Sequence, residues 1–133
     1  MLDINILIVE DKELLQLNSQ LKEKVKNVFI VNDAKEAIKL METEEIDIVL
    51  TDALPVNNGV EIVRYAIIHH TPIIPAVVVS KYKEFIKEWE ELPYIKVLHK
   101  PVNIDVLYDN IITVLKESDI DMSENYVMEL KNY

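Results

Sequence analysis

Five short apolar runs, each followed by a segment with helical periodicity, constrain the fold of this chain more than any other feature. The runs are rich in β-branched residues and nearly continuous in apolar character, as in strands that are buried on both faces of a sheet. Strands that alternate with helices usually form a parallel sheet. We therefore expect an α/β fold of three layers, with a doubly wound, five-stranded parallel sheet between helices. The expected strands are residues 4–9, 28–31, 47–51, 76–79 and 95–98.

The segments between these runs carry apolar residues at intervals of three and four, as in helices that pack one side against a sheet. A capping box at Asp33 and Glu36 marks the start of the second helix, and Gly59 opens the third. Asn103 is placed to cap the last helix. Pro75 should open the fourth strand, because a proline within a central strand would remove a hydrogen-bond donor. The first and fourth helices are expected over residues 12–26 and 82–91.

The third helix supports two further expectations. Its apolar positions, which include Val60, Val63 and Ala66, should face the sheet. The neighbouring His69 and His70 could suggest a metal site, but adjacent helical residues point about 100° apart. We therefore expect a C-terminal helix cap at this pair rather than a metal ligand pair.

The length of 133 residues suits a single domain with its own hydrophobic core. We expect this domain over residues 1–117 and a C-terminal tail over residues 118–133. In the tail, Asp121 and Glu124 have the spacing of a capping box, so a short extra helix is a reasonable expectation. The tail is too short for a DNA-binding output domain, which predicts a stand-alone protein unless the chain is a fragment. The tail helix could pack within one chain or across a dimer, so a homodimer is also possible.

Composition excludes several classes of function. The net charge of −10 argues against direct nucleic-acid binding, because phosphate backbones attract a basic face. The absence of cysteine excludes disulfides and thiolate chemistry. No apolar run approaches the ~20 residues of a membrane helix, and the N-terminus lacks a basic signal region. We expect a cytoplasmic protein with no membrane attachment.

Charged and hydroxyl side chains follow the expected strands. Glu10 and Asp11 come after the first strand, Asp52 after the third, Ser80 after the fourth and Lys100 after the fifth. These strand ends share one edge of the sheet, where open α/β folds bind their ligands. Clustered carboxylates repel one another unless a cation lies among them, and oxygen ligands favour Mg²⁺ before Zn²⁺. An ammonium and a hydroxyl beside them would bind phosphoryl oxygens, with a carboxylate as nucleophile.

Each of these residues alone has a plainer explanation. Acidic residues commonly cap helices, a serine often ends a strand, and a single lysine is usually solvated. Their occurrence together, at successive strand ends, favours a functional site.

The sequence resembles the receiver domains of two-component response regulators, which share the flavodoxin-like fold of the chemotaxis regulator CheY. The resemblance covers about residues 3–116. It rests on the motif ILIVED, on DIVLTD followed by a proline and NG, on the hydroxyl residue after the fourth run, and on KP after the fifth. It implies the strand order 2-1-3-4-5 and a cis peptide between Lys100 and Pro101.

The resemblance also implies the roles of the site residues. Asp52 matches the phosphoacceptor, Ser80 the switch hydroxyl, and Lys100 the lysine that pairs with the phosphoryl group. The implied cofactor is Mg²⁺, with ligands from Glu10, Asp11, Asp52 and the backbone carbonyl of Leu54.

The sequence departs from the family pattern in the loop after the acceptor. Pro55 is three residues after Asp52 instead of four, and Gly59 also comes one residue early. If Pro55 is held fixed, Thr51 takes the acceptor position. The spacing from Asp47 through the strand favours Asp52 instead, with one residue deleted from the loop.

Two further departures lie near the fourth and fifth strands. Val97 stands where the family usually has an aromatic residue, three positions before Lys100. Lys81 follows Ser80 where a small residue usually leaves access to the site. It either restricts the phosphodonors or points to solvent.

The resulting hypothesis is a receiver that takes a phosphoryl group on Asp52 from a histidine kinase or phosphotransfer protein, in a Mg²⁺-dependent reaction. Phosphorylation would switch binding to a downstream protein at the face formed by residues 82–91, residues 95–98 and the last helix. The protein would be no enzyme beyond its own phosphorylation and dephosphorylation. The alternative is a receiver-fold binding module that does not use phosphorylation, which the short loop, Val97 and Lys81 favour.

Overall fold

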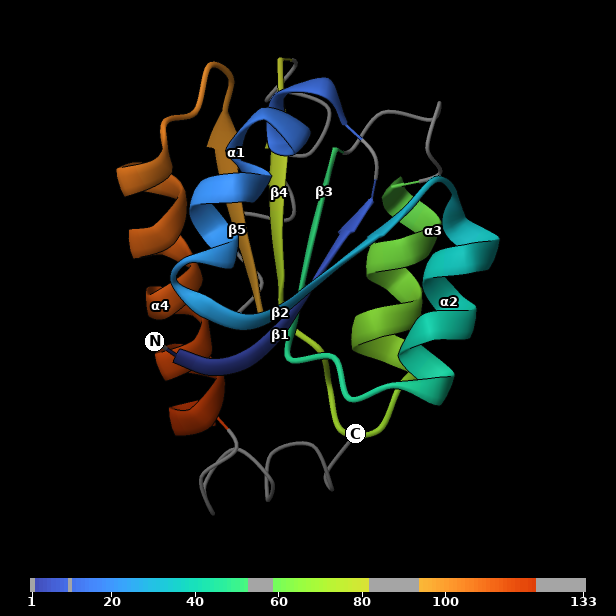
Figure 1. The fold of residues 1–133 in the computed structure, drawn as a ribbon. Helices are drawn as coiled ribbons and strands as arrows, with labels where there is room; N and C mark the ends of the chain where they lie inside the picture. The colour runs from blue at the N-terminus through green and yellow to red at the C-terminus, as the bar shows by residue number, and fades with distance from the viewer. Residues whose placement is uncertain (1, 10, 53–58, 82–93, 122–133) are drawn as a thin grey trace.

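The five strands form one parallel sheet in the order β2-β1-β3-β4-β5. The computed structural model describes residues 2–9, 11–52, 59–81 and 94–121 (Figure 1). This arrangement confirms the expected five-stranded α/β fold and the strand order that the resemblance implied. The strands are β1 (Leu2–Val9), β2 (Val25–Val31), β3 (Ile48–Asp52), β4 (Ala76–Ser80) and β5 (Ile95–His99).

The described helices cover the two faces of the sheet in pairs. Figure 1 shows α1 and α4 on one side and α2 and α3 on the other, which gives the three expected layers. The α3 helix continues into a π-helical turn, labelled η2. The helix expected over residues 82–91 lies outside the described residues. The helices are α1 (Lys12–Lys22), α2 (Ala34–Thr43), α3 (Gly59–Arg64), η2 (Tyr65–His69) and α4 (Ile104–Asp121).

The core consists of apolar clusters on both faces of the sheet, and β1 supplies side chains to both sides. Ile6 and Ile8 belong to the cluster beneath α1 and α4, whereas Leu7 and Val9 belong to the cluster beneath α2 and α3. All four are fully buried. Burial on both faces explains why this strand is continuously apolar in sequence rather than alternating.

The boundary between α1 and β2 differs from the expectation. The helix ends at Lys22 and the strand begins at Val25, instead of a helix to residue 26 and a strand from residue 28. Val25 is buried and pairs with Leu2 of β1, whose backbone N–H donates to the carbonyl of Lys24 at 2.8 Å. In the sequence, Val25 continues the helical spacing of α1. The structure places it in β2 instead, because β1 supplies a backbone hydrogen-bond partner there and a β-branched residue suits a strand.

The inward side of α3 is also displaced from the expected one. Val63 and Ala66 are buried as expected, but Val60 is 40% exposed, and Ile62 is fully buried in its place. Ile62 and Ala66 are one turn apart and pack with α2, while Val63 packs toward β4. These two contacts set the rotation of α3 about its own axis. Val60 therefore lies outside the side of the helix that is buried.

Local capping signals are confirmed at three elements. Asp33 Oδ1 accepts from the Glu36 N–H at 2.9 Å, and Asn103 Oδ1 accepts from the Val106 N–H at 2.8 Å. His70 is the C-terminal cap of η2, and its backbone N–H donates to the carbonyl of Tyr65. The side chain of His70 therefore serves a structural role, with its ring nitrogens near two carbonyl oxygens.

The remaining expectations concern the fourth strand and the last helix. Pro75 directly precedes β4, and its carbonyl accepts from the Val49 N–H at 3.0 Å. The α4 helix runs to Asp121, beyond the expected domain end at residue 117. Within the described ranges, no helix has the length and apolar character needed to cross a membrane.

A matched pair of isoleucines tests this core. Ile8 and Ile30 are register partners on β1 and β2, but Ile8 is 0% exposed and Ile30 is 41% exposed. We expect Ile8→Ala to lower the free energy of unfolding by about 2–5 kcal/mol, because a cavity forms in the core. Ile30→Ala should cost about 1 kcal/mol or less, because much of its surface is already in water. Urea unfolding measures both, and equal losses would contradict the packing described here.

Candidate functional site

The carboxyl ends of the strands lie at one edge of the sheet, the upper edge in Figure 1. Asp52 is the last residue of β3 and pairs in register with Val79, one residue before Ser80 at the end of β4. Lys100 directly follows β5, and Asp11 precedes α1. The topology thus brings together four of the residues that the sequence analysis selected: Asp11, Asp52, Ser80 and Lys100.

Lys100 joins the two carboxylates at this edge. Its ammonium donates to Asp11 Oδ1 at 2.6 Å and to Asp52 Oδ2 at 2.8 Å. The three side chains are only 8–10% exposed, so these ion pairs are shielded from solvent. We refer to these residues as the Asp11–Lys100–Asp52 trio. Its formal charge is −1, because two carboxylates share one ammonium.

The pKa of Lys100 lies above its ordinary value of 10.5. Burial acts to lower this pKa, but the hydrogen bonds and charges of Asp11 and Asp52 outweigh it. Since both effects of the carboxylates favour the charged amine, Lys100 remains an ammonium at neutral pH.

Asp11 is held in place by the start of α1. Its Oδ2 accepts hydrogen bonds from the backbone N–H groups of Glu13 and Leu14, each at 3.1 Å. This is the N-cap arrangement, and it leaves Oδ1 for Lys100. The plainer explanation of Asp11 as a helix cap is therefore correct, and the same carboxylate also belongs to the trio.

Asp52 and Thr51 differ in what their side chains contact. Thr51 is fully buried, and its hydroxyl donates to the backbone carbonyl of Asp52 at 3.0 Å. The Asp52 carboxylate instead bonds to Lys100. Of these two side chains, that of Asp52 therefore contacts the ammonium of Lys100.

Ser80 lies at the end of β4 and is almost completely buried. Its backbone carbonyl accepts from the Lys100 N–H at 3.0 Å, which ties the end of β4 to the residue that holds both carboxylates. The peptide between Lys100 and Pro101 is cis, as the resemblance implied, and Thr71–Pro72 is a second cis peptide that was not expected.

The donor set at this edge fits a hard cation in part. Asp11 Oδ1 and Asp52 Oδ2 bond to the same nitrogen, so they lie no farther apart than the sum of those two bond lengths. Carboxylate oxygens are the ligands that Mg²⁺ prefers, and in this structure both of these oxygens are bonded to the Lys100 ammonium. In the described ranges, no group of three His, Cys, Asp or Glu residues could hold a metal. Two other expected ligands, Glu10 and Leu54, lie outside those ranges.

One residue near the site was not selected from the sequence. Lys12 lines a hollow beside the trio, together with Lys81 and Lys100. The signal for Lys12 was its position directly after Asp11, at the start of a helix whose first turn lies at this edge.

The comparisons with known proteins identify the family and the fold. The sequence pattern of one family, described as response regulator receiver domain, matches residues 6–112. A search of the curated proteins found no significant match. Among solved structures, the chain is similar to the receiver domain of the Francisella response regulator 1452, with 20% identity and a TM-score of 0.69. That match covers 87% of this chain and 99% of the other.

A second similar structure is a response regulator receiver protein from Sinorhizobium medicae WSM419, with 23% identity and a TM-score of 0.66. It covers 86% of this chain and 95% of the other. A CheY-like receiver domain from Methylobacillus flagellatus has 20% identity and a TM-score of 0.66, with 86% and 99% covered. At these identities the structural matches show a shared fold.

The trio predicts how stability depends on pH. Because the folded-state pKa of Lys100 is raised, its stabilising effect is fully present below pH 10.5 and is lost as the pH rises through the folded-state pKa. We expect Lys100→Met to lower the free energy of unfolding at pH 7 by about 2–3 kcal/mol, because two carboxylates lose their counter-ion.

Urea unfolding between pH 7 and pH 11 tests this expectation. The stability of the wild type should fall more steeply above pH 10.5 than that of Lys100→Met. Lys35→Met, at an exposed lysine in the first turn of α2, is the matched control and should follow the wild type. Parallel curves for the wild type and Lys100→Met would contradict the raised pKa.

Proposed function

The chain belongs to the response regulator receiver domain family, and we propose that it accepts a phosphoryl group on Asp52 from a histidine kinase or phosphotransfer protein. The observation that carries this proposal is the contact between Lys100 and Asp52, at 2.8 Å in a shielded setting. An ammonium beside the acceptor oxygen can bind phosphoryl oxygens during and after transfer.

The proposed reaction uses the chain's own groups in defined roles. An oxygen of Asp52 attacks phosphorus, and the bond to the leaving group of the donor breaks. Lys100 already bonds to Oδ2 of Asp52, so its ammonium is close enough to bind the phosphoryl oxygens once they are attached to Asp52. Ser80, buried at the end of the adjacent strand, is the hydroxyl proposed to bind the same group.

Mg²⁺ is the proposed cofactor. Asp11 and Asp52 would hold it with oxygen ligands, and Glu10 and the carbonyl of Leu54 are proposed to complete the set. When bound, Mg²⁺ neutralises negative charge on the phosphoryl oxygens. Asp11 suits this role because its cap hydrogen bonds already orient the carboxylate toward Asp52 through Lys100.

The proposed signal is a redistribution of charge at this edge. A phosphoryl group carries about −1.5 to −2 charges at neutral pH, on the scale known for phosphorylated hydroxyl side chains, and on Asp52 it would replace the single negative charge of the carboxylate. Lys100 would then bind the new oxygens in place of one carboxylate, and the change would pass along β4 and β5 to α4. A switch from mostly off to mostly on needs about 5.5 kcal/mol of differential stabilisation. The output would be binding of a downstream protein at the face that includes β5 and α4.

Phosphorylation of Asp52 is tested by incubation with acetyl phosphate and Mg²⁺, followed by intact mass measurement. We expect the wild type to gain one phosphoryl group and Asp52→Asn to gain none, because an amide is a poor nucleophile. Asp109→Asn, at an exposed position on α4, is the control for the same substitution and should retain the gain.

Three outcomes would contradict the proposal. A gain that persists in Asp52→Asn would place the acceptor elsewhere, and its loss in Thr51→Val would point to Thr51. No gain in the wild type would favour a binding module with a fixed surface instead.

The proposed Mg²⁺ site has a second matched pair of variants. Asp11 and Asp33 are both N-cap residues, and asparagine caps helices about as well as aspartate. We expect Asp11→Asn to weaken Mg²⁺ binding by about tenfold or more, because a charged ligand is lost while the cap is kept. Asp33→Asn should leave the affinity unchanged. Isothermal titration calorimetry with MgCl₂ measures both, and equal affinities would exclude Asp11 as a ligand.

A further inference from the structure

The ring of His70 lies between two backbone carbonyl oxygens that come from different parts of the fold. Its Nδ1 is 2.6 Å from the carbonyl oxygen of Pro72, and its Nε2 is 3.0 Å from that of Met41. Met41 lies in the last turn of α2, whereas Pro72 lies in the segment that connects η2 to β4. The half-buried ring therefore joins the end of α2 to this connection.

Both contacts can be hydrogen bonds only when the ring carries two protons. A carbonyl oxygen accepts hydrogen bonds and cannot donate one, so each ring nitrogen must be the donor. The neutral ring has one N–H group and one nitrogen with a lone pair, whereas the charged imidazolium has two N–H groups. In the neutral ring, a lone pair would face a carbonyl oxygen at 2.6 or 3.0 Å, and these two groups repel each other. The geometry therefore fits the imidazolium.

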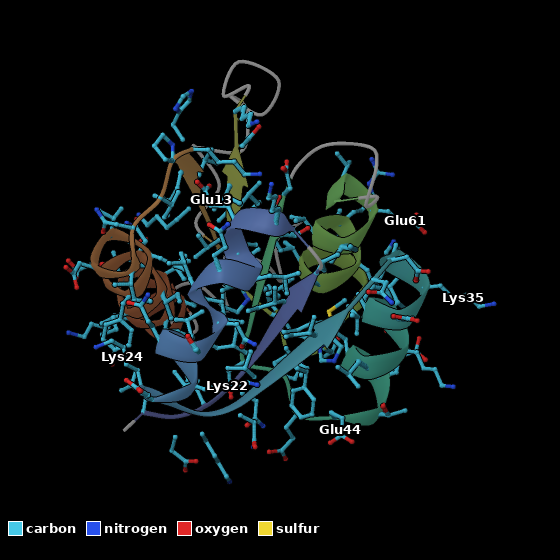
Figure 2. The ribbon with its side chains drawn as sticks, turned by 45° about the horizontal axis from the view of Figure 1, so that its top comes forward. Glu13, Lys22, Lys24, Lys35, Glu44 and Glu61 are labelled. Carbon is cyan, nitrogen blue, oxygen red and sulfur yellow. The ribbon has the colours of Figure 1, made fainter. Side chains whose placement is uncertain are left out.

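Carboxylates surround this contact. A hollow of about 430 Å³ lies beside the His70 ring, and its described lining has four carboxylates and no lysine or arginine. The carboxylates belong to Glu42 of α2 and to Glu44, Glu45 and Asp47, which precede β3. Figure 2 labels Glu44 at this end of α2 and Lys35 at the other end. Negative charges attract an imidazolium and not a neutral ring, so they act in the same direction as the two carbonyl oxygens.

Two aromatic side chains of η2 are the other titratable neighbours of this ring. The Tyr65 ring lies edge-on to that of His70, with centroids 6.2 Å apart, and is 6.3 Å from the ring of His69. The Tyr65 hydroxyl donates to Glu42 Oε1 at 3.2 Å. Burial and this carboxylate raise the pKa of Tyr65 above 10.0, so Tyr65 remains neutral at pH 8.0. Between pH 5.5 and pH 8.0, histidine is the side chain that ordinarily changes its charge.

We propose that His70 is a proton-dependent clamp, which holds the end of α2 to the connection between η2 and β4 with two hydrogen bonds when its ring is charged. When one ring nitrogen gives its proton to water, the hydrogen bond at that nitrogen is lost. The clamp lies near the amino end of β3, whereas Asp52 lies at the carboxyl end of that strand. It therefore does not depend on the proposed phosphorylation.

The direction of the pH dependence follows from the count of hydrogen bonds. In the unfolded chain, water is the partner of either form of the ring. In the folded chain, the charged ring of His70 makes one hydrogen bond more than the neutral ring. Folding and protonation of this ring thus favour each other, and the stabilisation is lost as the pH rises.

Urea unfolding of the full chain at pH 5.5 and pH 8.0 tests the clamp through stability. His70→Gln replaces the ring with a side chain that does not change its charge in this range. The readout is the unfolding equilibrium constant of His70→Gln divided by that of the wild type. We expect this ratio to be about three- to tenfold larger at pH 5.5 than at pH 8.0, because one hydrogen bond is at stake.

His69→Gln is the matched control, because it makes the same substitution at the exposed neighbouring residue. Its ratio to the wild type should differ by less than about twofold between the two pH values, since an exposed ring interacts weakly with nearby charges.

Nitrogen NMR of the histidine rings in the wild type is a second measurement, which does not require a variant to fold. At pH 5.5, both ring nitrogens of His70 should be protonated, with two N–H protons that exchange slowly with water because each is hydrogen-bonded. At pH 8.0, one of these nitrogens should have lost its proton. The exposed ring of His69 should show no slowly exchanging N–H proton at either pH.

Each outcome decides the inference. The clamp is overturned if the ratio for His70→Gln is the same at both pH values, or if His69→Gln shows an equal change. It is also overturned if a ring nitrogen of His70 lacks a proton at pH 5.5, or if both nitrogens keep their protons at pH 8.0. None of these results bears on phosphorylation of Asp52, which the mass measurement tests separately.

Discussion

The ammonium of Lys100, bonded at once to Asp11 and Asp52, is the interaction on which the functional edge of this molecule depends. It links the end of β3 to the start of α1 and to the residue after β5. Two carboxylates this close would repel one another without a cation between them. The burial of the trio strengthens the attraction and makes an unpaired charge costly, so all three groups are required together.

This arrangement has a consequence for phosphoryl transfer. The trio carries one excess negative charge, which suits the addition of a cation such as Mg²⁺. A phosphoryl group on Asp52 would bring further negative charge and would compete with Asp11 for the same ammonium. Cation binding and acceptor chemistry would then both depend on how charge is shared around Lys100.

Much of this fold could be predicted from the sequence, because strands buried on both faces leave a strong apolar signal. The errors of prediction occurred where one sequence pattern was compatible with two different structures. Val25 fits the helical stripe of α1 and also the first position of β2, and the partner strand decided for the sheet. Val60 fits the periodicity of α3, but contacts with α2 and β4 turned Ile62 inward instead. Periodicity identifies an apolar side of a helix but does not set its rotation against a neighbour.

The sequence by itself determined the class of fold, the strand ends and the identity of the polar residues at those ends. Those properties follow from local patterns of burial, capping and chain connectivity. Only the tertiary structure decided that Asp11 shares its two oxygens between the helix cap and Lys100, and that Lys12 and Lys81 line one hollow. Lys100 follows Asp11 by 89 positions and Asp52 by 48 positions. Contacts over such separations depend on the register and order of the strands, which no local pattern encodes.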